Sequence, residues 1–198
     1  LEFRRVLFRS FAAADKGGWE AMGTFDIINA RVNGYQYHVD LMAGREKWTD
    51  PRTAKVFEYW EQLVPYMNDN VLDLEWDGAM QLLLQRKAGA MLMGSWFGGN
   101  FKEQSDADYE DLWIIPFPEI NPEHKRDTID APIDGFCAAK NGTNNDGGKD
   151  FLAFAGDMEG VQAMLDTGVP MTSANKGQDT STYDAFQKQQ LAVMGEIG

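Results

Sequence analysis

Apolar residues recur at helical spacing in five stretches of the chain. Residues 24–41 carry apolar side chains three or four positions apart, and residues 50–66 do so after an Asp–Pro pair that is typical of a helix start. The same spacing predicts a helix at 76–85, one or two helices within 147–165, and a last helix at about 183–194. The aromatic residues of the 50–66 stretch are expected to face the core.

Three short apolar runs lack this spacing and predict β-strands. They lie within 88–96, at 112–115 and within 131–141. In the helical stretch that follows, Phe151 and Phe154 are expected to face inward. Helices that alternate with short apolar strands indicate an α/β fold. Three strands make a small sheet for a chain of this length, so we expect the sequence to be part of a larger α/β protein.

The first ten residues, LEFRRVLFRS, resemble a translated sequencing adapter. We therefore assign residues 1–10 as an artefactual segment and leave it out of the fold. The biological chain is then expected to begin near Phe11, after any signal peptide.

Composition excludes several classes of function. The chain has 31 acidic and 18 basic side chains, a net charge of −13, and lacks the basic stripe that nucleic acid or an anionic membrane requires. A hydrophobic content of 43% is typical of a folded domain, and no apolar run approaches the ~18 residues of a membrane span. One cysteine and two histidines give no Cys/His metal framework, and we expect neither a metal nor a cofactor.

The common catalytic motifs are absent from the sequence. Ser95 lies in Gly-Ser-Trp rather than in the Gly-x-Ser-x-Gly turn of hydrolases, and the sequence has no GxGxxG, P-loop or HExxH motif. Carboxylates are abundant, so a glycosidase-like pair stays open as an alternative, although the sequence fixes no distance between any two of them.

Several loops combine an aromatic residue with small neighbours, as in MLMGSWFGGNF at 91–101. Flat C–H faces of sugars pack on Trp or Phe rings, while their hydroxyl groups bond to carboxylates, amides and backbone groups. Glycine next to the ring leaves room for such a ligand. The candidate binding residues are Trp19, Gly94, Ser95, Trp96, Asp134 and Gly135.

The segment RKAGAMLMGSW resembles Gly-Lys-Ala-Ala-Met-x-x-x-Gly-x-Trp of the family 1 extracellular solute-binding proteins. These are the maltose-binding-protein-like substrate-binding subunits of carbohydrate ABC importers. Arg86 and Ala90 depart from that pattern, whereas Lys87, Gly94 and Trp96 agree with it. Further similarity runs in order through residues 19–190.

The resemblance implies a partial periplasmic-binding-protein type II fold, with two α/β lobes joined at a hinge and the chain truncated at both ends. Residues 11–131 would form most of the C-terminal lobe, 132–139 a hinge crossover strand, and 140–198 part of the N-terminal lobe with later helices. Trp96 would stack on a sugar, Gly94 and Ser95 would allow close approach of the backbone, and Trp19 would add a second aromatic wall. Asp134 would bond hydroxyl groups near the hinge, where Gly135 lets the backbone bend.

The function implied by the resemblance is capture of a sugar or oligosaccharide outside the cytoplasmic membrane and its delivery to ABC permease subunits. The protein would be a monomer, periplasmic or extracellular, lipid-anchored and not an enzyme. Alternatives are a secreted carbohydrate-active hydrolase and a binding protein for a non-sugar solute such as a peptide or polyamine. A chain with only part of the cleft is expected to bind weakly by itself.

Overall fold

The computed structural model describes residues 9–126, 128–131, 135–168, 171–173 and 175–195. By their contacts, these residues divide into two compact units. The first contains the chain up to Gly94 together with Ile115–Asp130, and the second contains Ser95–Ile114 and Ala131–Gly195. Each unit is described by itself. The lobe boundaries predicted from the sequence stay a prediction.

The first predicted helix is two helices in the structure. The chain forms α1 at Trp19–Asn33 and α2 at Tyr35–Met42, with Gly34 between them at φ 85° and ψ 162°. This backbone conformation strongly favours glycine. A Cβ atom at position 34 would also lie 2.8 Å from the ring of His124, far along the chain. The break therefore depends on a tertiary contact, and the prediction of one continuous helix was wrong.

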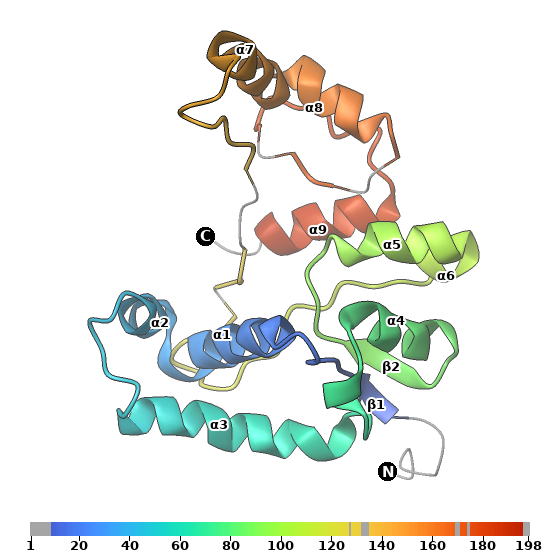
Figure 1. Ribbon diagram of the computed structural model, residues 1–198. Helices are drawn as coiled ribbons and strands as arrows, with labels where there is room; N and C mark the ends of the chain where they lie inside the picture. The colour runs from blue at the N-terminus through green and yellow to red at the C-terminus, as the bar shows by residue number, and fades with distance from the viewer. Residues whose placement is uncertain (1–8, 127, 132–134, 169–170, 174, 196–198) are drawn as a thin grey trace. The chain divides into compact units, whose positions relative to one another are not determined.

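The next two helices confirm the sequence prediction. Helix α3 spans Pro51–Leu63 and begins as expected, because the Asp50 side chain accepts a hydrogen bond from the backbone N–H of Arg52 at 2.8 Å. Two short 3₁₀ turns, Val64–Tyr66 and Val71–Asp73, lead to α4 at Trp76–Leu84. Figure 1 labels these helices and colours the chain from blue at the N-terminus to red at the C-terminus.

The described sheet has two strands. Strand β1, Arg9–Ala12, pairs in parallel with β2, Ala88–Met91, with Phe11 opposite Ala90. β2 was predicted. β1 was not, and it includes two residues of the segment that was assigned as artefactual.

Two predicted strands are not found. Residues 112–115 and 135–139 have no strand structure, and 132–134 lie outside the described residues. Trp113 and Ile115 are 73% and 79% exposed, and neither pairs with a strand in the described part of the chain.

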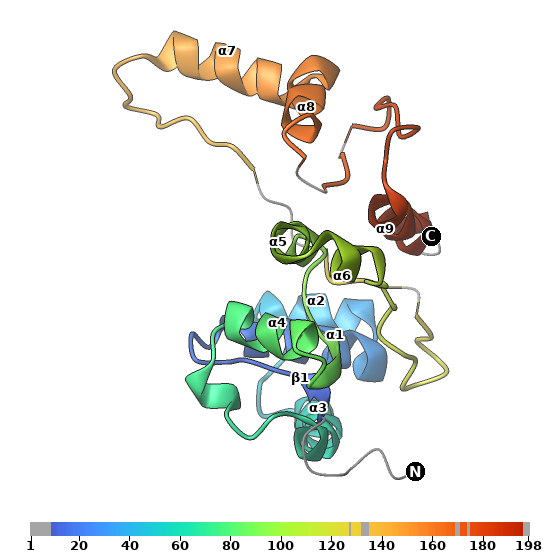
Figure 2. The ribbon, with the colours of Figure 1, turned by 90° about the vertical axis from the view of Figure 1, so that its right-hand side faces the viewer.

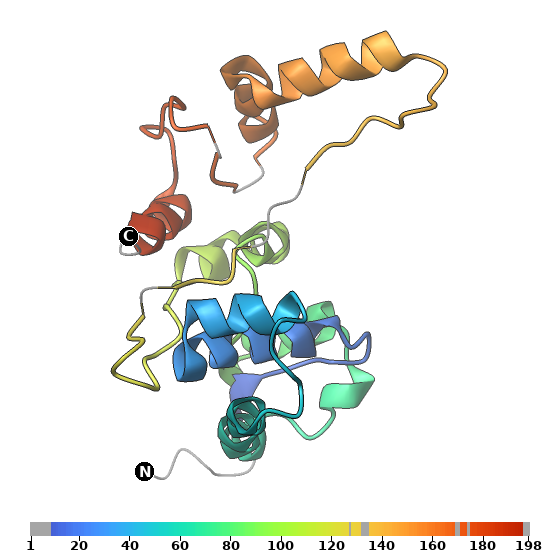
Figure 3. The same ribbon diagram turned by 90° about the vertical axis from the view of Figure 1, so that its left-hand side faces the viewer.

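The core of the first unit lies between α1, α2 and α3. Ile28, Leu41 and Val56 are essentially inaccessible to solvent there, and α3 lies next to α1 in Figure 3. Phe57, expected in this core, is half exposed although its ring lies 5.4 Å from that of Phe25.

Arg31 is fully buried in the same unit. Its Nε donates to the carbonyl of Phe117 at 3.1 Å, and its Nη1 donates to the carbonyl of Thr128 at 2.6 Å. A buried cation is tolerated when such acceptors surround it. These bonds tie the 117–130 segment to α1.

The described residues of the second unit are mainly helical. Its helices are α5 at Phe97–Gln104, α6 at Asp106–Glu110, α7 at Asn145–Gly156, α8 at Met158–Leu165 and α9 at Ala185–Gly195. α7 and α8 follow one another with an abrupt change of direction (Figure 2), which confirms two helices within 147–165.

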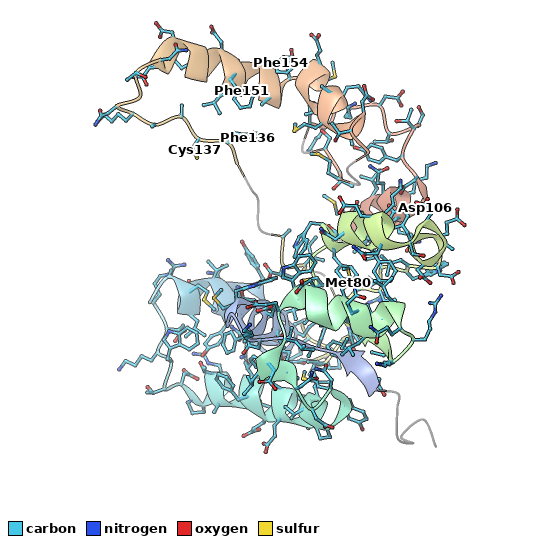
Figure 4. The ribbon with its side chains drawn as sticks, turned by 45° about the vertical axis from the view of Figure 1, so that its right-hand side comes forward. Met80, Asp106, Phe136, Cys137, Phe151 and Phe154 are labelled. Carbon is cyan, nitrogen blue, oxygen red and sulfur yellow. The ribbon has the colours of Figure 1, made fainter. Side chains whose placement is uncertain are left out.

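The inward-facing role expected for Phe151 and Phe154 is wrong for this structure. Their side chains are 53% and 46% exposed, and α7 has no buried residue. Phe151 packs edge-on against Phe136, itself exposed, with ring centroids 5.5 Å apart (Figure 4). The same stretch lies close to the start of α7, because a Cβ atom at Gly148 would be 3.4 Å from Ala138 Cβ.

Candidate functional site

The six candidate residues do not form one described group. Trp19 and Gly94 belong to the first unit, whereas Ser95, Trp96 and Gly135 belong to the second. Asp134 lies outside the described residues. The structure therefore gives the geometry of two separate groups, and the joint site stays a prediction.

Trp19 is the first residue of α1, with its side chain 39% exposed. It follows Gly18, which has a left-handed backbone at φ 79°, and Gly17 lies near the indole edge. A Cβ atom at position 17 would be 3.2 Å from Trp19 Cδ1 and 3.2 Å from Glu75 Oε2. Because this spacing is tighter than ordinary van der Waals contact, a side chain at 17 would push on both groups.

The N-cap residue of α1, Gly18, has no side chain, and Asp15 supplies the capping group instead. Its Oδ1 accepts a hydrogen bond from the backbone N–H of Ala21 at 3.1 Å, whereas Gly18 offers no side chain. An acidic group at the N-terminus also interacts favourably with the helix dipole. The start of α1, which carries Trp19, is thus capped by Asp15.

Trp96 immediately precedes α5, and its side chain is 46% exposed. The carbonyl of Ser95 accepts hydrogen bonds from the N–H of Gly98 at 3.1 Å and from Gln190 Nε2 at 3.4 Å. Gly94 and Ser95 are exposed, and the approach of a ligand to them stays a prediction.

Gly98, the first glycine after Trp96, has a packing role. A Cβ atom at Gly98 would overlap the ring of Phe186 on α9. Phe186 in turn lies 5.4 Å from the ring of Tyr109. Gly98 therefore lets α5 approach α9, and its presence says nothing about a ligand at Trp96.

Gly135 lies in open surroundings. No heavy atom would come within 4 Å of a Cβ atom at this position, and its neighbour Phe136 is exposed. Its role in hinge bending stays a prediction.

Asp26 is a polar group that the sequence did not single out. Burial raises its pKa above the ordinary value of 3.8, an effect that His38 opposes and Asp130 reinforces. Asp26 lies seven residues after Trp19 on α1, so the two share a helix face. That spacing was visible in the sequence, whereas His38 on α2 and Asp130 reach Asp26 only through the fold.

The second unit contains a polar cavity of about 260 Å³. Its lining includes Lys102, Asp166, Thr182 and Asp184. Lys102 Nζ lies 3.6 Å from Asp184 Oδ2, an oxygen that also accepts the Tyr109 hydroxyl at 2.9 Å. Burial raises the pKa of Tyr109, and this bond raises it further. The described lining contains none of the six candidate residues.

Within the described residues, no three His, Cys, Asp or Glu side chains are grouped as metal ligands. Among the helices of these residues, none has the length and apolar character needed to cross a membrane.

Comparison with known proteins decides the family. Residues 9–162 match the model of the bacterial extracellular solute-binding proteins. The chain belongs to this family. The recognition made from RKAGAMLMGSW and its flanking segments is thereby confirmed.

Two curated relatives come from Pyrococcus horikoshii, and both are uncharacterized ABC transporter extracellular-binding proteins. One is 28% identical over 180 residues, which is 90% of this chain and 38% of the relative. The other is 28% identical over 110 residues, or 54% of this chain and 24% of the relative.

Two solved structures share the fold. The bacterial solute receptor AcbH, described as having an exclusive preference for β-D-galactopyranose, is 37% identical with a TM-score of 0.89. A chitin oligosaccharide binding protein is 20% identical with a TM-score of 0.76. In each case the match covers 96% of this chain and 48% of the other. The chain thus spans about half the length of these proteins, which confirms the prediction of a partial solute-binding fold.

Proposed function

We propose that this chain is part of an extracytoplasmic binding protein that captures a sugar and passes it to an ABC importer. The observation that carries this proposal is the 37% identity to the galactopyranose receptor across nearly the whole chain. The two exposed indoles, Trp19 and Trp96, support it because aromatic rings are the groups on which sugar faces pack.

In this mechanism the protein binds and releases the sugar without catalysing a reaction. A sugar held between two lobes favours the closed arrangement of the protein, and the closed form is the one that a permease recognises. In this scheme the protein is a monomer that works outside the cytoplasmic membrane, held there by a lipid anchor, and it releases its sugar unchanged.

The acidic surface fits a neutral ligand. With a net charge of −13, the chain repels anionic solutes at long range. A neutral sugar such as galactose is therefore favoured over a phosphorylated or carboxylated one.

The test is a titration of the chain with neutral sugars, including galactose and N-acetylglucosamine oligomers, followed by Trp fluorescence and by NMR of the indole N–H groups. We expect saturable binding, and unchanged sugar after long incubation. Binding should weaken in Trp19→Ala and Trp96→Ala but not in Trp113→Ala, a control that removes an exposed indole outside the candidate site.

Other outcomes would contradict the proposal. Hydrolysis of a sugar would support a carbohydrate-active hydrolase instead. Binding of a peptide or polyamine, with no response to any sugar, would support a binding protein for a non-sugar solute.

A further inference from the structure

One face of α1 combines an indole, an open glycine and a carboxylate. Trp19, Gly23 and Asp26 are separated by four and then three residues, so they lie above one another on the helix. The opposite face, with Phe25 and Ile28, is buried in the core. We call the group Trp19, Gly23 and Asp26 the α1 face.

Gly23 leaves space in the middle of the α1 face. No heavy atom would lie within 4 Å of a Cβ atom at this position. A glycine inside a helix makes that helix less stable than an alanine would. Nothing in the packing of the described residues requires a glycine here, in contrast to Gly98.

The far end of the α1 face carries hydrogen-bonding groups from three segments. Asp26 of α1 lies close enough to His38 of α2 and to Asp130 for both to act on its charge. The 117–130 segment is held in place by Arg31, whose guanidinium donates to the carbonyl of Thr128. The cluster is therefore fixed by the fold of the first unit alone.

A chain of amide contacts assigns the proton of His38. Asn33 Nδ2 donates to Asn29 Oδ1 at 2.8 Å and to the carbonyl of Arg52 at 3.0 Å. Asn29 Oδ1 is thus the acceptor, so its Nδ2 donates to His38 Nδ1 at 3.3 Å. In the neutral ring the proton then resides on Nε2, which is a donor.

These groups match the chemistry of a neutral sugar. A hydroxyl group both donates and accepts, so it can donate to a carboxylate and accept from an imidazole N–H. Trp19 and Asp26 are about 10 Å apart along the helix axis, at 1.5 Å per residue, which leaves room for a small saccharide above Gly23. Asp26 and Asp130 both repel a ligand that carries its own carboxylate.

We propose that the α1 face, with His38 beside it, is the sugar-recognition surface of the first unit. A pyranose ring packs on Trp19 above Gly23, and its hydroxyl groups bond to Asp26 and His38. This inference rests on the proposed function, and it adds the residues that select a neutral, hydroxyl-rich ligand.

The main test places a side chain at Gly23. Gly23→Leu places a large side chain above the α1 face, at a position where a Cβ atom has no heavy atom within 4 Å. Leucine also favours a helix over glycine, so the fold should keep its Tm. Sugar affinity, measured by NMR titration, should fall at least about tenfold because the ring can no longer reach Trp19. Gly23→Ala, which adds one methyl group, is the matched control and should lose little affinity.

A second test concerns charge. Asp26→Asn should weaken galactose binding about tenfold, as expected for loss of a hydrogen bond to a charged acceptor. Glu58→Gln, the same chemical change on the exposed surface of α3, should leave binding unchanged. Wild type should also bind galactose more tightly than galacturonate, and Asp26→Asn should reduce that preference.

The outcomes separate this inference from the proposed function. If wild type binds no sugar even at the millimolar concentrations that reveal weak binding, both the proposed function and this inference are contradicted. If a sugar binds and is released unchanged, yet Gly23→Leu and Asp26→Asn bind it as wild type does, the sugar function stands and the α1 face is overturned.

Discussion

Two loops of this protein place a tryptophan next to glycines, and the glycines do different work. In the loop before Trp19, a Cβ atom at Gly17 would lie 3.2 Å from both the Trp19 indole and the Glu75 carboxylate. After Trp96, Gly98 in the first turn of α5 accommodates the Phe186 ring, so it serves the packing of α5 on α9. The same local pattern thus accompanies an exposed ring in both places, but Gly17 borders the Trp19 ring whereas Gly98 borders a ring on another helix.

The largest expected effect is the loss of stability when Gly98, the glycine that packs on Phe186, is replaced. Gly98→Ala should destabilise the second unit by about 1–3 kcal/mol, since overpacking forces ring and backbone shifts. Gly23→Ala, the same change at an open helix position, should instead stabilise by about 0.5–1 kcal/mol. Thermal unfolding with hydrogen exchange of α5 and α9 measures both. Equal effects of the two substitutions would contradict the assigned role of Gly98.

The next effect compares the two indoles in ligand binding. Trp19→Ala and Trp96→Ala should each cost about 1–2 kcal/mol of sugar affinity if the rings stack on the ligand. Isothermal titration or NMR titration gives the two values. Full affinity in Trp96→Ala would leave Trp19 as the aromatic group of the site.

A smaller effect is expected when Gly17 is changed. Gly17→Ala pushes the Trp19 indole by a few tenths of an ångström, because its Cβ would lie 3.2 Å from Cδ1. We expect a loss of affinity below about 1 kcal/mol and little change in Tm, as for a surface substitution. An unchanged indole N–H resonance of Trp19 would show that the ring does not respond to this neighbour.

The smallest effect concerns the pH dependence of Asp26. Its pKa is raised in the folded protein, mainly by burial, so the folded state binds its proton more tightly than the unfolded state. The stability from this group is therefore present at low pH and is lost as the pH rises from 3.8 through the raised pKa.

Asp26→Asn should consequently raise Tm slightly at pH 7 relative to wild type. The corresponding increase in the free energy of unfolding should stay below about 1 kcal/mol, because solvent screens this partly exposed group. The same variant should bind sugar less well, and a variant that loses Tm instead would indicate a structural role for the carboxylate.

The sequence predicted the helices whose start and spacing are set by neighbouring residues. Asp50 and Pro51 marked the start of α3, and the apolar spacing after Trp76 marked α4. The break at Gly34 was missed because it also depends on His124, ninety residues away in the sequence. β1 was missed because its first residues were set aside as artefact.

The candidate site shows the same division between local and distant signals. Exposed tryptophans beside glycines could be found from the sequence, because the pattern is local. The role of Gly98 could not, since Phe186 lies far along the chain. Asp26 was likewise missed because His38 and Asp130 reach it only in the folded unit.

The most direct test of sugar binding is an NMR titration of the chain with galactose that follows each indole N–H. The proposal predicts a saturable shift of the Trp19 resonance and none for Trp113, with the Trp19 shift lost in Gly23→Leu. Equal, non-saturating shifts of both resonances, or no shift at all, would contradict it.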